Sequence, residues 1–272
     1  ADSAPSSIQA IAHLVFEGEE PPAHLGYSTD RVKELGFTSK VGSTLQLVTP
    51  EGPVVVLTGG GQREEVDTAQ VRDAVAVFAR AVPKQTHLAL ALPALDLDDD
   101  GVASAALEGA ALARYVYRIG EDGPEAKLDQ FVVVADSARH EAVRTGLDRG
   151  EVLVRATKLA RDLAGTPGGI LTATRIGEVA EDVGAKTGLE VEIFVEDQLV
   201  EMGCGGLLGV NLGSVEPPVM VKLVYRPEGE PTGRLTLVGK GIMYDAGGLA
   251  LKPGDEVHAT MKNDMTGAAA IL

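Results

Sequence analysis

The sequence predicts an α/β protein built from two units, the second of which contains a mixed central sheet. Its 272 residues exceed the roughly 150 residues of a typical single domain. Short apolar runs alternate with segments of helical period, and several of these runs are apolar on both faces. Such strands are typical of a sheet covered by helices on both sides. We place the boundary near residue 150, with an amino-terminal unit 1–150 and a second unit 151–272.

The elements of the first unit follow from the period of the apolar residues and from glycine and proline breaks. Val71, Val75 and Phe78, for example, recur at helical spacing. The predicted order is strands 8–16, 44–48 and 54–58, helix 66–82, strand 87–92, helix 103–117 and strand 131–135. We interpret 59–61 as a strand-to-helix turn rather than an anion nest, and both 96–100 and 120–125 as polar loops.

The second unit begins with a helix, 141–164, that the Gly165–Gly169 segment GTPGG ends. A helix 172–186, closed by Gly188, comes next. The remaining predictions are strand 190–195, a short helix 197–202, strands 207–212, 219–225 and 235–242, a glycine-rich stretch, and an alanine-rich helical segment 265–272.

Composition excludes several classes of function. The net charge of −16 disfavours nucleic acid and anionic membrane surfaces as partners. Cys204 is the sole cysteine, so a disulfide framework is excluded and a reducing, cytoplasmic setting fits best. No apolar run approaches the ~18 residues of a membrane span, and residues 1–9 lack the features of a signal peptide.

Two lysines and two aspartates alternate in the glycine-rich stretch: Lys240, Asp245, Lys252 and Asp264. Lys240 follows the predicted strand, at the carboxyl end where α/β sheets place ligands. The alternative without a functional role is a surface loop in which these residues form ion pairs. Apolar and small neighbours favour partial burial, however, and a buried charge needs a partner or a metal ion. A lysine ligand must first lose a proton, which desolvation and a nearby dication would favour.

Other candidate motifs are weaker. The segment around Gly239-Lys240-Gly241 does not fit a phosphate-binding P-loop, because its spacing is wrong and no Ser or Thr follows the lysine. We interpret Cys204 as a small buried residue rather than a nucleophile. The histidines occur singly, without an HExxH pair, and we interpret them as structural or exposed: His13, His24, His87, His140 and His258. Of these, His258 is nearest to the charged cluster in the sequence.

Residues 239–271 closely resemble the metal-binding core of the leucyl (cytosol) aminopeptidase family. The shared pattern is GKG, an aspartate, GG, LKP and MK-x-DM-x-GAAA. Upstream, 156–167 resembles the inter-domain segment of the family, and 202–218 resembles the strand region before its core. The first half resembles the family's variable amino-terminal α/β domain, similar to macro domains, only in the order of its elements.

The resemblance implies a dinuclear metallo-aminopeptidase, a hydrolase that removes leucine-like amino-terminal residues from peptides. Lys240, Asp245 and Asp264 would be ligands of two divalent ions, Zn²⁺ or Mn²⁺, with Asp245 bridging both. Lys252 would be the catalytic electrophile at the scissile carbonyl. Met261 would line the pocket for the first side chain, so these five residues would together bind substrate. The resemblance also implies a homohexamer.

Three departures from the family pattern leave a second function open. The family carries a further aspartate, glutamate and arginine downstream, so we expect residues up to Leu272 to hold part of the site. The stretch from Lys252 to Asp264 is slightly longer than in the family, and Gly165-Thr166-Pro167 replaces an Asn-x-Pro. The alternative is a non-catalytic module on the same scaffold, which binds a nucleotide-like ligand through its first domain or serves in assembly.

Overall fold

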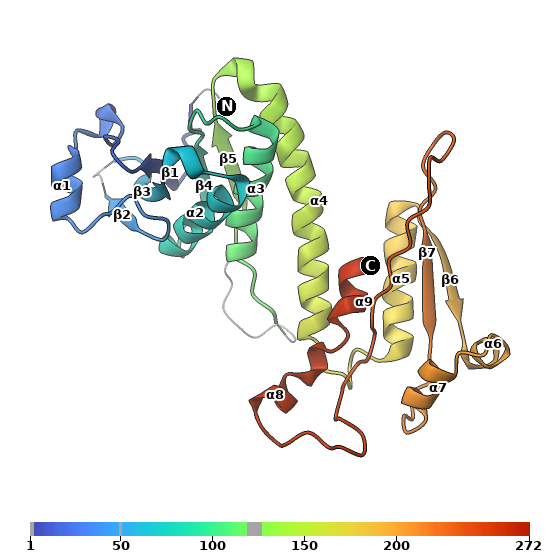
Figure 1. Ribbon diagram of the computed structural model, residues 1–272. Helices are drawn as coiled ribbons and strands as arrows, with labels where there is room; N and C mark the ends of the chain where they lie inside the picture. Colours follow the sequence, from blue (N-terminus) through green and yellow to red (C-terminus); the bar gives the residue numbers. More distant parts are fainter. Residues whose placement is uncertain (1–2, 49–50, 119–126) are drawn as a thin grey trace. The chain divides into compact units, whose positions relative to one another are not determined.

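The computed structural model describes residues 3–48, 51–118 and 127–272 (Figure 1). The chain divides into two compact units, Ala1–Lys158 and Leu159–Leu272. The polar loop predicted at 120–125 lies outside the described residues. The α/β class is confirmed, and no helix among the residues described is long and apolar enough to cross a bilayer.

The first unit is built on a five-stranded mixed sheet of order β2-β3-β1-β4-β5. Its parallel strands are β1 (Ala10–Phe16), β3 (Val54–Gly61), β4 (His87–Ala91) and β5 (Gln130–Val134), and β2 (Thr44–Leu47) pairs antiparallel with β3. Successive residues of β1 face opposite sides, so that Leu14 and Phe16 enter one core and Val15 the other.

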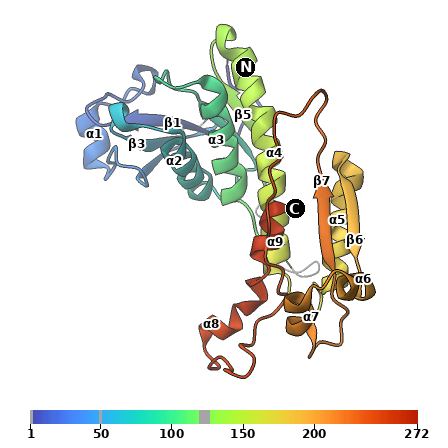
Figure 2. The same cartoon turned by 45° about the vertical axis from the view of Figure 1, so that its right-hand side comes forward.

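Helices cover both faces of this sheet, as the doubly apolar strands predicted. On one face, α2 (Thr68–Ala81) and α3 (Asp99–Ala113) lie side by side and enclose the larger core (Figures 1 and 2). On the other face, α1 (Thr29–Glu34) contributes Val32 to a smaller core with Phe37. Asp67 begins α2 with a capping box, its side chain accepting the N–H of Gln70.

Two local predictions in the first unit are wrong. Residues 59–61 continue β3 instead of forming a turn. Glycine is needed there for packing, because a Cβ on Gly60 would lie 2.6 Å from the Phe16 ring. The acidic run 96–100 is also not wholly a turn: α3 begins at Asp99, where carboxylates interact favourably with the helix amino terminus.

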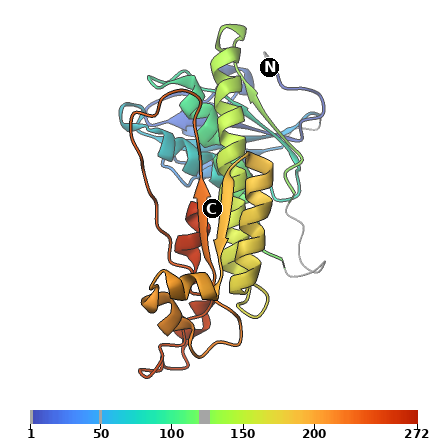
Figure 3. The same ribbon diagram turned by 90° about the vertical axis from the view of Figure 1, so that its right-hand side faces the viewer.

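The long helix α4 (His140–Gly165) ends where the GTPGG segment predicts, and its last residues belong to the second unit. There α5 (Ala173–Thr187) lies along the antiparallel pair β6 (Glu190–Phe194) and β7 (Met220–Val224), as Figure 3 shows. Gly188 ends α5 with a left-handed φ of 74°, as expected. The short helices are α6 (Glu196–Glu201), α7 (Gly205–Asn211), α8 (Glu256–Ala259) and α9 (Thr266–Ile271).

Two strand predictions in the second unit are wrong. Residues 207–212 lie mostly in helix α7, since a short apolar run fits either structure. Residues 235–242 form no strand, and Leu235 and Val238 are largely exposed. Among the described residues of this unit, only β6 and β7 pair as a sheet. Lys240 therefore does not follow a strand, and other contacts must position it.

Candidate active site

Lys240 is positioned by close contact between two backbone segments. The N–H of Ala268 in α9 donates to the Lys240 carbonyl at 2.9 Å. A Cβ on Gly239 would lie 2.4 Å from the carbonyl oxygen of Gly267, so only glycine allows this approach. The glycine before Lys240 thus serves packing against α9 rather than phosphate binding.

Asp264 is held in place by the apolar residue that follows it. Met265 is fully buried and packs in the core of the second unit with Leu163, Ile176 and Ala269. That core joins α9 to the last turns of α4 and to α5. The Asp264 carboxylate is therefore fixed at the start of α9, with its side chain 20% exposed.

The four charged residues form two ion pairs in the structure. Lys252 Nζ donates to Asp245 Oδ2 at 2.6 Å, and the N–H of Gly247 donates to Asp245 Oδ1 at 2.9 Å. Gly247 has φ of 97°, a conformation that favours glycine. Lys240 Nζ lies 2.6 Å from Asp264 Oδ2.

Asp245 is the electrostatic centre of the four residues. The hydrogen bond from Lys252 lowers the pKa of the Asp245 carboxyl below its usual value, helped by the Gly247 N–H. The positive charges of Lys252 and Lys240 lower this pKa further. Both lysines therefore act on one carboxylate, which stays ionised at neutral pH.

Met261 and His258 lie on the same stretch of chain as the ion pairs. The Asp245 N–H donates to the Met261 carbonyl at 3.4 Å, a long hydrogen bond, and the Met261 side chain is half-buried. The Tyr244 hydroxyl donates to the His258 carbonyl at 3.2 Å, and the two rings lie 5.7 Å apart. The His258 Nε2 atom is buried and has no hydrogen-bond partner among the described residues.

The donor set fits a divalent cation in part. Asp264 Oδ2 is enclosed, and no described residue makes a hydrogen bond of good geometry to it, although Lys240 neutralises its charge. A cation is a natural partner for such an oxygen. Among the residues that the structure describes, however, no three His, Cys, Asp or Glu side chains are grouped to hold a metal. Asp245 and Asp264 therefore offer two carboxylates but do not by themselves form such a group within the described part of the chain.

The structure also shows the surroundings of Cys204 and of three residues near the charged cluster that the sequence analysis did not single out. Cys204 is free and half-buried, rather than fully buried as predicted. Sequence reasoning overlooked Lys262, whose Nζ donates at 2.6 Å to the Gly165 carbonyl at the end of α4. It also overlooked Gly267 and Tyr244. The signal for Lys262 was its position in the MK-x-D segment, beside Asp264.

The fold and the charged cluster define an α/β protein with a partly buried lysine–aspartate centre in its second unit. The family model described as "Cytosol aminopeptidase family, catalytic domain" matches residues 158–272. The model of the same family's N-terminal domain matches residues 23–119, so the two cover most of the chain. The chain belongs to the cytosol aminopeptidase family, as the sequence resemblance predicted.

Curated relatives and solved structures agree with this assignment. Proteins described as "Probable cytosol aminopeptidase" are 37% identical over 222 residues in Solibacter usitatus and 31% identical over 274 residues in Aquifex aeolicus. These alignments cover 80% and 97% of this chain, but 45% and 55% of the relatives. The chain thus spans about half the length of the relatives it matches.

Among solved structures, the chain is similar to the "Bottromycin maturation enzyme BotP", with a TM-score of 0.79 and 31% identity. That match covers 97% of this chain and 54% of the other. The same enzyme "in complex with Mn" matches with a TM-score of 0.77, 32% identity and the same coverage.

Proposed function

We propose that this chain carries one part of the catalytic centre of a metal-dependent aminopeptidase with a preference for leucine-like amino-terminal residues. The observation that carries the proposal is the pairing of Lys252 with Asp245 and of Lys240 with Asp264, within the region that matches the family's catalytic domain. The names of the relatives and the Mn complex of the similar enzyme support it.

Lys240, Asp245 and Asp264 are the residues that would hold the metal. Two divalent ions, Zn²⁺ or Mn²⁺, would supply Lewis-acid polarisation of the scissile carbonyl and acidify water. Asp245 presents two oxygens, and the Gly247 N–H fixes the orientation of one of them. Asp245 would be one of the residues that hold the metal. Asp264 presents an enclosed Oδ2 whose charge the Lys240 ammonium neutralises at 2.6 Å.

Lys252 supplies positive charge that does not depend on the metal. Its Nζ is held by Asp245, and its N–H donates to the Ala246 carbonyl at 3.0 Å. An ammonium fixed in this way stabilises negative charge that develops on the carbonyl oxygen of the substrate. Met261 is assigned to the pocket for the first side chain of the peptide, because its backbone is tied to that of Asp245.

Calorimetry with Mn²⁺ tests this assignment. We expect the full chain to bind Mn²⁺ and Asp245→Asn to weaken binding at least tenfold, because a ligand carboxylate is lost. The matched control is Asp182→Asn, which removes an exposed carboxylate on α5 and should bind as the parent does. An absence of Mn²⁺ binding, or equal binding by Asp245→Asn, would favour the non-catalytic binding or assembly module instead.

The proposal extends to location and assembly. The cytosolic description of the relatives supports a cytoplasmic enzyme that acts on peptides. The assignment to a homohexamer comes from the family resemblance alone. Sedimentation velocity on the protein checks it, and a monomer at micromolar concentration would contradict it.

A further inference from the structure

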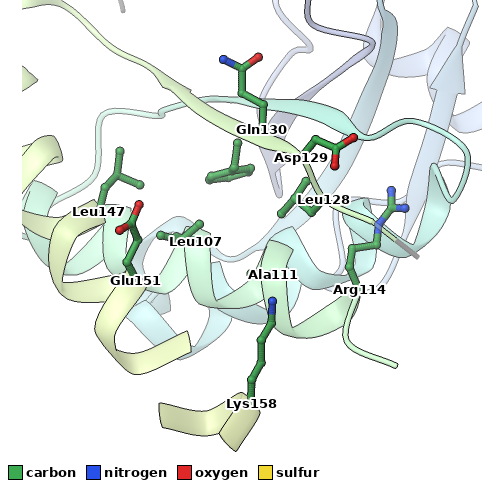
Figure 4. A pocket seen from close by; sticks show the side chains of 10 residues that line it. Leu107, Ala111, Arg114, Leu128, Asp129, Gln130, Leu147, Glu151 and Lys158 are labelled. Carbon is green, nitrogen blue, oxygen red and sulfur yellow. The ribbon is translucent and has the colours of Figure 1, made fainter. Parts of the chain in front are cut away.

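A cavity of about 280 Å³ lies in the first unit, between α3, β5 and α4 (Figure 4). Its volume is close to the lower end of small-ligand sites, roughly 300 Å³. Half of its lining is apolar and comes from all three elements and the residues just before β5: Leu107, Ala111, Leu128, Phe131 and Leu147. The cavity is thus able to enclose an apolar side chain.

Two opposite charges on α4 face this cavity. Glu151 and Lys158 are seven residues apart, two turns of the helix, and so lie on one face about 10.5 Å apart along the axis. In Figure 4 the Glu151 carboxylate lies beside Leu107, and the Lys158 ammonium is directed toward Ala111. Within the described part of the chain, neither charge has a hydrogen-bond or ion-pair partner. The pocket therefore presents a free anion and a free cation at separate places.

A buried donor lies one turn beyond Ala111. Arg114 is 5% exposed, and its two terminal nitrogens donate to the carbonyls of Val82, Pro83 and Gln85. Its Nε is buried without a partner among the described residues. The guanidinium therefore places a fixed positive charge in the wall of the cavity, where Asp129 also places a carboxylate.

We propose that this pocket binds a short peptide of about two residues, with its ammonium at Glu151, its carboxylate at Lys158 and Arg114, and its apolar side chains against the cavity lining. An extended peptide advances about 3.3 Å per residue, so two residues plus a hydrogen bond of about 2.8 Å at each end span roughly 12 Å. That length is comparable to the ~10.5 Å that separates positions 151 and 158 along the helix axis, whereas a free amino acid is shorter.

The choice of a peptide as the ligand rests on the proposed aminopeptidase function, whereas the arrangement of the charges does not. The cavity lies wholly within Ala1–Lys158, the unit that contains none of the candidate active-site residues. Peptide capture by this pocket is therefore measurable without metal and without hydrolysis.

The first test is calorimetry of the metal-free full chain with leucyl-leucine. We expect one binding site, and at least tenfold weaker binding of leucine, of N-acetyl-leucyl-leucine and of leucyl-leucine amide. Each of these ligands lacks one charged contact, and tenfold corresponds to 1.4 kcal/mol. Equal binding of the dipeptide and its blocked forms, or no binding of the dipeptide, would overturn the proposal.

Variants then locate the site. Glu151→Gln should weaken leucyl-leucine at least tenfold but leave N-acetyl-leucyl-leucine unchanged, because that ligand has no ammonium to lose. Lys158→Gln should likewise weaken leucyl-leucine at least tenfold, but leave leucyl-leucine amide unchanged, because the amide has no carboxylate to lose. The control Lys186→Met, at an exposed position on α5, should bind the dipeptide as the parent does. If Lys252→Met alone abolishes binding, the peptide occupies the candidate active site, which overturns this proposal while supporting the proposed function.

Discussion

The Lys252 ammonium lies 2.6 Å from Oδ2 of Asp245, and the other oxygen of that carboxylate accepts the N–H of Gly247. Both oxygens of Asp245 are thus occupied by donors from its own loop. A metal ion that binds to Asp245 must displace the lysine or share an oxygen with it. Under the proposed function, a bound metal ion and Lys252 would therefore be neighbours on the same carboxylate.

Removal of the Lys252 ammonium should separate metal binding from turnover. Under the proposed function, we expect Lys252→Ala to retain the metal content of the parent and to lose about 10²–10³-fold in kcat, since a group that stabilises developing charge is gone. Metal analysis and peptide hydrolysis, measured on the same preparation, check this. A turnover near that of the parent would show that the role assigned to Lys252 is wrong.

The same contact should be visible in the titration of Asp245. The Lys252 hydrogen bond is the largest cause of the lowered carboxyl pKa, so Lys252→Met should raise that pKa toward its ordinary value. Because the folded pKa is lowered, the pair stabilises the fold above the unfolded carboxyl pKa of about 3.9. This contribution is lost as the pH falls through the folded value. Carbon NMR of Asp245 checks the shift, and an unchanged pKa in the variant would contradict the contact.

His13 predicts a second pH dependence, in the first unit. Burial is the larger cause that lowers the pKa of His13 from 6.5 to about 4, and the neighbouring His24, with ring centres 5.4 Å apart, is the smaller one. The unfolded chain therefore binds more protons between pH 4 and pH 6.5, so stability falls as the pH drops through this window. Since the ring is partly exposed, we expect a loss on the order of 2 kcal/mol.

Urea unfolding at several pH values checks the effect of His13. The difference in unfolding free energy between His13→Gln and the parent should change across this window, because the variant lacks the titrating ring. A constant difference would contradict the lowered pKa. His24→Gln should reduce the slope only slightly, since His24 is the smaller cause.

Two glycines in α3 give a matched pair of packing variants. A Cβ on Gly109 would lie 2.3 Å from the Arg72 carbonyl oxygen, so Gly109→Ala forces α2 and α3 apart. We expect a loss of about 1–3 kcal/mol in unfolding free energy. A Cβ on Gly101 would make an ordinary contact at 3.5 Å, so Gly101→Ala should stabilise by about 0.5 kcal/mol. Urea unfolding checks both, and equal effects of the two variants would contradict the close approach.

The sequence predicts elements well where local signals agree. Gly188 ends α5 and the GTPGG segment ends α4 as expected. These signals act within one or two turns of the chain and need no distant partner. The doubly apolar strands of the first unit likewise indicate their own burial under helices.

The remaining errors concern segments whose structure depends on distant partners. The runs 207–212 and 235–242 have apolar residues typical of strands, but a strand needs a neighbour to pair with, and period alone does not supply one. In the candidate site, the sequence predicts that the four charged residues act together, whereas the pairing of Lys240 with Asp264 and of Lys252 with Asp245 emerges only from the folded loop.

The contact between Gly60 and Phe16 links two strands that are paired in the sheet. The ring of Phe16 occupies the space that a side chain at position 60 would need. The Arg63 guanidinium lies over the same ring, 4.2 Å from its centre. These two sites are therefore expected to co-vary during evolution. A lineage that acquires alanine or a larger residue at 60 must also accept a smaller one at 16, and such compensating exchanges would be detectable in an alignment of descendants.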